Sequence, residues 1–326
     1  MEWRNNRVLV TGASGVIGRT VVQRLAGLDV RLLAVDIAPG DAKGDALNMG
    51  VDRLQADLSR ADLGFIRAFD PHILFHLAAT FERTEETPDF WESNFAHNLT
   101  ASHRLLQAVQ DCQSLRALVF ASSYLIYDPK LYLDVPKVHP LMESEAIAPR
   151  NLVGLAKYFT ERELDFVGKT AHQFRTISAR IFRVYGRGSR DVISRWIRAA
   201  LQGETIEVYH SDGRFDYIFA DDVAEGLIKL AEAPGAQGIV NLGFGTARSV
   251  ADVVEILRQE FPGLQLRHTS MEGSSEGSCA NMKYFSELTK WIPPTSLEQG
   301  IRQVVAYEMA KQSSRPMATA GAVQPA

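Results

Sequence analysis

Cysteine is nearly absent from this chain of 326 residues, which contains only Cys112 and Cys279. The two are isolated and form no CxxC pair, so a disulfide framework is excluded. Apolar runs long enough to span a bilayer are absent as well. The first predicted strand begins within a few residues of Met1, so we expect neither a signal peptide nor a membrane segment. These absences favour a cytoplasmic protein.

An excess of one charge is also missing. Lys and Arg total 35 against 39 Asp and Glu, and the formal net charge of -4 provides no basic field for binding nucleic acid. The eight histidines show no metal-ligand spacing, so we predict no metal site. Hydrophobic residues make up 46% and charged residues 23%, which is ordinary for a globular enzyme, and the length suffices for two lobes.

The clearest motif that is present lies near the N-terminus. A strand, a glycine turn and a helix form the layout of a dinucleotide-binding site, and after the apolar run 7–10 the chain reads Thr11-Gly12-Ala13-Ser14-Gly15-Val16-Ile17-Gly18. Gly12 takes backbone angles that a β-carbon would forbid, Gly15 permits close approach of a pyrophosphate, and Gly18 lets the helix pack on the strand. The amide groups at the helix start would face the phosphates. The alternative is a tight strand-to-helix turn without a ligand.

An acidic residue follows the second predicted strand. The run 30–35 is apolar and ends at Asp36, whose carboxylate would accept hydrogen bonds from the adenosine ribose and would repel a 2′-phosphate. No Arg or Lys comes directly after it, since the next residues are Ile37, Ala38, Pro39 and Gly40. The sequence therefore favours NAD over NADP. The alternative is a surface aspartate that caps a turn.

The predicted elements alternate between strand and helix as far as about residue 180, which is typical of βαβ units and a parallel sheet. The predicted strands there are 7–11, 30–36, 52–56, 73–77, 116–122 and 175–181, and the helices are 16–27, 59–68, 91–111 and 151–168. Beyond residue 182 the pattern is mixed, with helices near 190–202, 221–232, 249–260, 284–290 and 296–311 and strands at 206–209, 216–219, 238–241 and 264–267. The Pro-rich segment 128–149 predicts a long loop, and the residues 313–326 predict a disordered tail.

Further short signatures follow in order along the chain. They are Ala56-Asp57-Leu58, His76-Leu77-Ala78-Ala79, Asn98, Ala121-Ser122-Ser123-Tyr124, Lys157, Arg180-Ile181-Phe182-Arg183-Val184-Tyr185-Gly186 and Phe215-Asp216-Tyr217. Asp57 is placed to meet the adenine amino group, and the small residues after His76 leave room for a cofactor. Together these motifs are far more specific than any one of them.

This series resembles the extended short-chain dehydrogenase/reductase family, in its NAD-dependent epimerase/dehydratase group, over about residues 7–310. The resemblance implies a Rossmann-like, doubly wound parallel sheet in 1–182, with the catalytic helix at 150–170. It implies a smaller mixed α/β substrate lobe in 183–312, with strands partly interleaved. It also implies hydride transfer between NAD and a sugar-like, nucleotide-activated substrate. The NAD contacts that it implies are Gly12, Ser14, Gly15, Val16, Ile17, Gly18, Asp36, Ile37, Asp57, Leu58, Leu77, Ala78, Ala79, Asn98, Ser122 and Lys157.

The chain departs from the family at the catalytic tyrosine. The register set by Gly154 and Lys157 places Val153 where the family has the Tyr that exchanges a proton. By resemblance, Ser123 still orients the reacting oxygen and Lys157 still holds the nicotinamide ribose. Tyr124 is the best candidate for the proton carrier; the alternatives are a packing role for its ring, with water or a substrate group moving the proton. Leu125 stands where dehydratases have a Glu, which argues against sugar 4,6-dehydration.

A second departure concerns the substrate. Where relatives hold a diphosphate with two arginines, this chain has Phe215 and, in a looser alignment, Ser270. The predicted substrate contacts are Thr80 and four arginines that suit phosphate or carboxylate, namely Arg183, Arg187, Arg190 and Arg214. The alternative for the arginines is a solvated basic helix start.

Two hypotheses on function remain open at this point. The first is an NAD-dependent oxidoreductase or epimerase, and the second is a non-catalytic NAD-binding protein, for which Val153 is the main argument. The resemblance also implies a homodimer in which helices 91–111 and 151–168 pack against their copies. Apolar positions for it are Leu99, Leu106, Leu152, Phe159 and Phe166, which are also compatible with the core faces of these helices.

Overall fold

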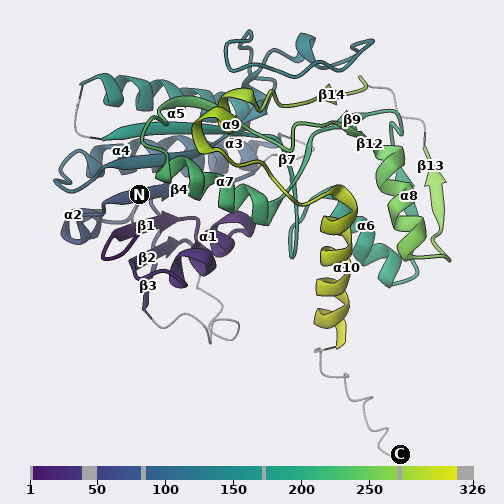
Figure 1. The fold of residues 1–326 in the computed structure, drawn as a ribbon, viewed down its shortest axis with the longest axis horizontal. Coiled ribbons are helices and arrows are strands. Elements are labelled where there is room, and N and C mark those ends of the chain that lie inside the picture. The colour runs from purple at the N-terminus through teal and green to yellow at the C-terminus, as the bar shows by residue number, and fades with distance from the viewer. Residues whose placement is uncertain (1–2, 39–49, 82–85, 171–173, 270–273, 314–326) are drawn as a thin grey trace, which may run out of the picture.

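A seven-stranded sheet forms the centre of the computed structural model, which describes residues 3–38, 50–81, 86–170, 174–269 and 274–313 (Figure 1). Every neighbouring pair in the sheet is parallel, and the order is β11-β6-β5-β4-β1-β2-β3. The strands are β1 (Arg7–Thr11), β2 (Arg31–Asp36), β3 (Val51–Gln55), β4 (Ile73–His76), β5 (Ala117–Ser123), β6 (Arg175–Ile181) and β11 (Gly238–Leu242). The predicted Rossmann-like α/β class is confirmed.

Alternating side chains on each strand supply two cores, one on each face of the sheet. Val8 and Val10 of β1 pack on one side, with α1 (Val16–Ala26), α7 (Ala220–Glu232) and α9 (Lys283–Thr289). Leu9 packs on the other side, with α2 (Gly64–Phe69), α4 (Ala101–Val109) and α5 (Leu152–Thr170). Such burial on both faces is why the central strands β1, β4 and β5 are largely apolar, whereas β3, at the edge of the sheet, is not.

The strand order reverses between β1 and β4: β1, which ends at Thr11, pairs with β2 on one side and with β4 on the other. In an open parallel sheet, the crevice beyond the carboxyl ends of the strands at such a switch point is where ligands bind. The glycine motif follows β1, and the small residues Leu77, Ala78 and Ala79 follow β4. The topology therefore brings these two predicted segments to one place.

The second half of the chain builds a smaller lobe beside the sheet, seen at the right of Figure 1. Its core joins α6 (Val192–Leu201), α8 (Val250–Glu260) and α10 (Leu297–Ser313). Its short strands form three small sheets. The first pairs β7 (Arg183–Tyr185) with β10 (Tyr217–Phe219), and the second has the order β12 (Arg248–Ser249), β9 (Arg214–Phe215), β14 (Gly277–Ser278). The third pairs β8 (Ile206–Val208) with β13 (Leu266–His268).

The chain passes between the two parts more than once. Helix α7 and strand β11 come after residue 182, yet α7 packs against α1 and β11 pairs with β6 in the large sheet. A cut at residue 182 would therefore divide the sheet. The division of the chain into two parts at residue 182 stays a prediction. Strand β11 of the large sheet comes from the second of these parts.

Two predicted helices differ from the observed ones. The helix expected at 59–68 begins only at Gly64, because the Asp57 side chain accepts hydrogen bonds from the Ser59 backbone N (2.9 Å) and Oγ (2.7 Å) and so forms a turn there. The helix expected at 91–111 is α3 (Pro88–Asn94), a π-helical turn (Phe95–Thr100) and α4 in succession.

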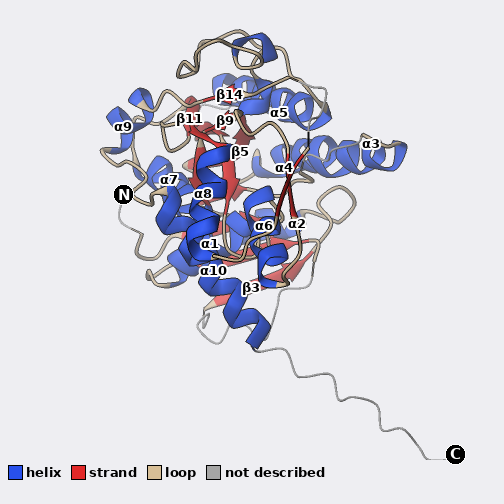
Figure 2. Ribbon diagram, turned by 90° about the vertical axis from the view of Figure 1, so that its right-hand side faces the viewer, coloured by secondary structure: helices blue, strands red, loops and turns tan. Residues whose placement is uncertain are grey.

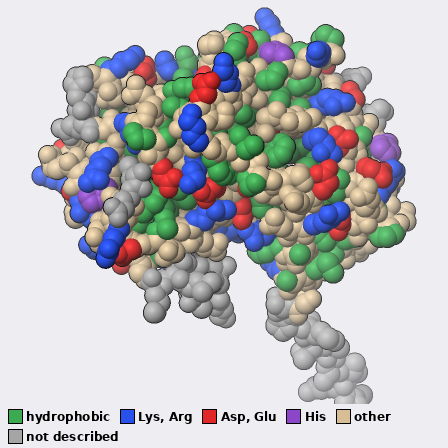
Figure 3. Space-filling model, in the orientation of Figure 1, with side chains coloured by type: hydrophobic (Ala, Val, Ile, Leu, Met, Phe, Trp, Pro, Cys, Tyr) green, Lys and Arg blue, Asp and Glu red, His purple; other side chains and the backbone are tan. Residues whose placement is uncertain are grey.

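The end of the chain and its surface complete the description. The predicted tail begins at Ser313, which is the last residue of α10, and the rest of that prediction lies outside the described residues. Among the helices that the structure describes, none has the length and apolar character to cross a membrane. Figure 3 shows Lys and Arg interspersed with Asp and Glu over one face.

Candidate functional site

The glycine turn after β1 is shaped by backbone contacts that exclude side chains. Gly12 has φ +70°, and a β-carbon there would lie 2.5 Å from the backbone N of Ala78. A β-carbon on Gly18 would collide with the carbonyl oxygen of Gly12. Helix α1 follows its N-cap residue Gly15 without a side-chain cap, so no side-chain oxygen occupies its N-terminus, and its first amide groups, including those of Val16 and Ile17, are available to an anion.

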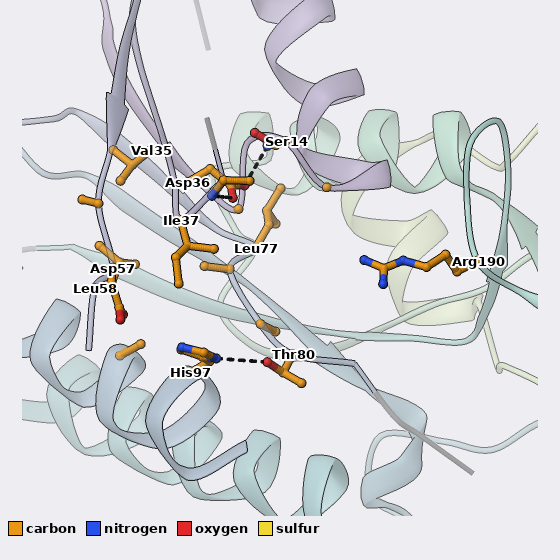
Figure 4. A pocket seen from close by; sticks show the side chains of 17 residues that line it. Ser14, Val35, Asp36, Ile37, Asp57, Leu58, Leu77, Thr80, His97 and Arg190 are labelled. Carbon is orange, nitrogen blue, oxygen red and sulfur yellow. Dashed lines mark hydrogen bonds between the residues drawn. The ribbon is translucent and has the colours of Figure 1, made fainter. Parts of the chain in front are cut away.

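Asp36 lies at the end of β2, facing this turn. One of its carboxylate oxygens accepts from the backbone N of Ser14 (2.8 Å) and the other from that of Ala38 (2.9 Å). These two hydrogen bonds fix the orientation of the carboxylate at the edge of the crevice, as Figure 4 shows. The Pro39 and Gly40 that were considered with it lie outside the described residues.

A cavity of about 330 Å³ occupies this crevice (Figure 4). It is lined by ten of the predicted NAD contacts, namely Gly12, Ser14, Gly15, Asp36, Ile37, Asp57, Leu58, Leu77, Ala78 and Ala79. Two residues that we predicted for the substrate, Thr80 and Arg190, line it as well. A turn that only glycine permits, uncapped helix amides and an oriented carboxylate fit the pyrophosphate and ribose of a dinucleotide.

Asp57 and His97 face each other across this cavity in Figure 4. Burial alone would raise the pKa of Asp57, but the hydrogen bonds from Ser59, together with the charges of His97 and Arg60, lower it below its ordinary value. The sequence analysis did not find His97, whose Nδ1 lies 3.4 Å from Thr80 Oγ1. Its position directly before the predicted Asn98 is the signal that was available.

Asn98 does not line the cavity but holds the loop that does. It is buried in the π-helical turn, where its Oδ1 accepts from the Thr80 backbone N (2.7 Å) and its Nδ2 donates to the Thr80 carbonyl (2.9 Å). The extra residue of a π-helical turn changes the direction of the side chains that follow. Asn98 thereby pins the backbone after β4 at both of its polar groups.

The other predicted catalytic residues gather at the carboxyl end of β5. Ser123 is its last residue, and its Oγ accepts from the backbone N of Leu125 (3.2 Å). Lys157, on α5, is buried and donates from Nζ to the carbonyl of Ala121 (2.6 Å), with Nζ 4.6 Å from the centre of the Phe120 ring. Burial lowers the pKa of Lys157 to about 8, although the charge of Glu161 opposes this shift.

A buried ion pair lies beside Lys157. Arg180 of β6 donates from Nε (3.0 Å) and Nη2 (2.8 Å) to the two carboxylate oxygens of Glu161, and both side chains are 1% exposed or less. Ser122, predicted as a cofactor contact, donates from Oγ to the same carboxylate (2.6 Å). Glu161 lies one helical turn after Lys157 in the sequence, but its partner on β6 was not predicted.

Tyr124 is buried at the junction with the smaller lobe. Its hydroxyl donates to Glu276 Oε1 (2.8 Å), and its ring stacks on Phe182 with centroids 5.1 Å apart. Arg150 donates to the other oxygen of Glu276 (2.8 Å). The hydroxyl therefore has an acceptor of its own, and the role of Tyr124 as a proton carrier stays a prediction.

The four predicted arginines have different partners. Arg183 lies over the ring of Phe215, with its guanidinium carbon 4.8 Å from the ring centre. Arg187 pairs with Asp221, whereas Arg190 lies over Phe81 (5.1 Å) beside the cavity. Arg214 is exposed on β9, and Ser270 lies outside the described residues.

Comparison with known proteins gives the site its family. The model of the NAD dependent epimerase/dehydratase family matches residues 8–243, and the chain belongs to this family. The UDP-glucose 4-epimerase of Streptomyces lividans is 30% identical over 279 residues, covering 78% of this chain and 81% of that protein. The UDP-glucose 4-epimerase of Mycolicibacterium smegmatis is 26% identical over 323 residues, covering 92% and 98%.

A solved structure agrees with these relatives. MoeE5 in complex with UDP-glucose and NAD superposes with a TM-score of 0.79 at 26% identity, covering 94% of this chain and 99% of that one. The predicted extended short-chain dehydrogenase/reductase type is confirmed, and so is NAD as the cofactor.

Proposed function

We propose that the protein is an NAD-dependent oxidoreductase or epimerase that acts on a nucleotide-linked sugar by hydride transfer. The observation that carries the proposal is the pair at the end of β5. Lys157 is anchored on the carbonyl of Ala121, two residues before Ser123, on the strand next to β4. A protein that only senses NAD has no need of a serine there, whereas a lysine that holds the nicotinamide ribose fits both hypotheses.

The residues have separate tasks in this proposal. The first amides of α1 bind the pyrophosphate, Asp36 accepts the ribose hydroxyls, and NAD supplies the hydride acceptor. Ser123 donates a hydrogen bond to the reacting oxygen and so orients it. Arg183, placed over Phe215, supplies a cation next to the position where relatives have their arginine for the diphosphate.

The proton carrier must differ from that of the family, because Val153 is buried and cannot exchange a proton. The sequence offers Tyr124. Replacing Tyr124 with Phe removes only the hydroxyl, and a loss of roughly 10²–10⁴-fold in turnover with NAD binding intact would support its role. Tyr158→Phe is the matched control, because Tyr158 lies on α5 with Arg162 over its ring (5.5 Å). Unchanged turnover in Tyr124→Phe would eliminate Tyr124.

We further propose that the protein works as a homodimer in the cytoplasm. Helices α3 and α5 pack side by side in Figure 2. Together with the π-helical turn that follows α3, they expose apolar side chains in the described structure, namely Trp91, Phe95, Leu155, Phe159 and Phe166. An apolar face of this kind on two adjacent helices suits a helical interface with a second copy. Leu106, which we considered for this face, is buried in the core at 2% exposure instead.

Turnover tests the proposal. Purified protein, with its bound nucleotide identified after denaturation, is incubated with a panel of UDP-, dTDP-, GDP- and ADP-linked sugars, and the products are followed by proton NMR. We expect bound NAD and conversion of at least one sugar. The second hypothesis, a non-catalytic NAD-binding protein, would be favoured if NAD is bound but no sugar is converted, and if Ser123→Ala and Lys157→Met leave NAD binding unchanged. The buried Val153 is the observation that points to this hypothesis.

A further inference from the structure

The buried face of α5 carries three residues in line, one helical turn apart. They are Val153, Lys157 and Glu161, and all three side chains are buried. Val153 has no proton to exchange. On the buried face of this helix, which the structure describes in full, Lys157 and Glu161 are the ionisable groups, and they are candidates for the proton carrier beside Tyr124.

Glu161 is committed to other partners. Its two oxygens take two hydrogen bonds from Arg180 and one from Ser122, at 2.6 to 3.0 Å. A carboxylate paired in this bidentate way is shared between two cations, and its charge raises the pKa of Lys157 by less than burial lowers it. Lys157 is thus a buried amine that shares its nearest acid with the guanidinium of Arg180.

Among the contacts of the described residues, no ionised acid faces Lys157 from an element other than α5, although the Phe120 ring and the Ala121 carbonyl favour its charged form. His76 of β4 is fully buried, and burial together with the charge of Lys157 lowers the pKa of His76 to about 3, so this ring is neutral near pH 7. On β5, the Phe120 ring and the Ala121 carbonyl face Lys157. On β6, Arg180 lies behind Glu161. The bond to Ala121 survives loss of a proton, because a neutral amine still has two hydrogens to donate.

We propose that Lys157 itself moves the proton of the reacting hydroxyl, in place of the family's tyrosine, with Glu161 and Arg180 as positioning residues. The inference rests on the proposed function. The lone pair of neutral Nζ takes the hydroxyl proton of the sugar, directly or through one water. The O–H electron pair becomes the second bond of the carbonyl, and the hydride leaves the same carbon for NAD, which is the oxidant. On return of the hydride, the ammonium gives the proton back.

The titration of Lys157 is consistent with this task. Its pKa is lowered to about 8 by burial, so near neutral pH a useful fraction of the amine is uncharged. A lysine that serves only to hold the ribose acts as a cation, and the two roles respond to pH in opposite directions. Oxidation rises with pH through this pKa when the amine is the base, and falls through it when the ammonium is required.

The first experiment measures the amine without turnover. The NAD-bound protein is prepared with isotopically labelled lysine, the Lys157 side-chain signal is assigned with Lys157→Arg, and it is titrated by NMR. We expect a midpoint near 8, well below the ordinary 10.5. Glu161→Gln removes the charge that opposes the shift, so the midpoint should move to lower pH. An amine that stays protonated up to pH 10 would overturn the proposal, whether or not any sugar is converted.

The second experiment follows oxidation against pH with a substrate found by the panel. The rate should rise through the same midpoint, move with it in Glu161→Gln, and fall roughly 10²–10⁴-fold in Lys157→Met while NAD stays bound. Lys169→Met is the matched control, because Lys169 is an exposed lysine of the same helix paired with Asp165. A rate that falls through the midpoint would assign Lys157 to the ribose alone and overturn the inference. Failure of the whole panel would count against the proposed function, and the titration would still decide the charge of Lys157.

Discussion

The cavity at the β1–β4 switch point and the end of β5 are held together in different ways. The cavity is built largely from backbone, since a positive φ at Gly12, the start of α1 and two amide bonds to Asp36 define it. The end of β5 is built from side chains buried against one another, with Arg180, Glu161 and Lys157 at its centre. A backbone site leaves a readable trace of glycines, whereas a side-chain network can exchange a residue such as Val153 and still stay packed.

The comparison predicts that damage to the network costs stability and that damage to the cavity costs binding. The largest effect belongs to His76, next to Lys157. Burial lowers the pKa of His76 to about 3 from 6.5, so the unfolded chain takes up this proton before the folded one. The stabilisation is present above pH 6.5 and is lost as the pH falls toward 3, by up to about 5 kcal/mol.

Urea unfolding between pH 7 and pH 4 measures the His76 effect. His76→Gln keeps a donor and an acceptor for Thr11 and Ser102, its present partners at 2.8 and 2.9 Å, but does not titrate. The variant should show a flatter dependence on pH than the natural chain. Equal slopes would mean that His76 is not the group that titrates.

Breaking the buried ion pair is expected to cost almost as much. Arg180→Met leaves Glu161 buried without its cation, which should lower the free energy of unfolding by about 3–5 kcal/mol. The double variant Arg180→Met, Glu161→Leu removes both charges and should recover most of that loss. Arg162→Met, on the exposed side of α5, is the control. If the double variant is no more stable than the single one, packing rather than charge dominates at this position.

A substitution in the cavity should weaken NAD binding rather than lower the stability of the fold. Asp36→Asn keeps the side chain's shape but removes its charge, so NAD should bind roughly 10–100-fold more weakly, which corresponds to about 1.5–3 kcal/mol for hydrogen bonds to a charged group. The preference over NADP should narrow, because the repulsion of the 2′-phosphate is gone. Calorimetry with both cofactors measures this, with Asp29→Asn as a surface control. An unchanged ratio of the two affinities would contradict the role of Asp36.

The contrast between a cavity shaped by backbone and a network of buried side chains also explains which features could be predicted from the sequence. The strand patterns in the sequence predicted every strand of the large sheet, and the glycine motif predicted the place where the cavity lies. The π-helical turn at Asn98 was not predicted, because no glycine or proline within Phe95–Thr100 marks it and it continues directly from one helix into the next. The partner of Glu161 was missed because Arg180 is nineteen positions away on another element, and pairing across elements has no spacing in sequence.

A substitution on the outward face of α5 should change the oligomeric state without affecting the cavity or the side chains at the end of β5. Phe166 is 68% exposed there, and if the proposed dimer forms through α3 and α5, Phe166→Glu places two like charges at the interface and should give a monomer at micromolar concentration in sedimentation. The fold itself should change by no more than about 0.5 kcal/mol, because the side chain contributes little to the core. Ile292→Glu, at an equally exposed apolar side chain away from these helices, should leave the oligomeric state as it is. The interface would be rejected if the natural chain already sediments as a monomer. If Phe166→Glu gives a monomer in which the titration of Lys157 is altered, the two faces of α5 are coupled.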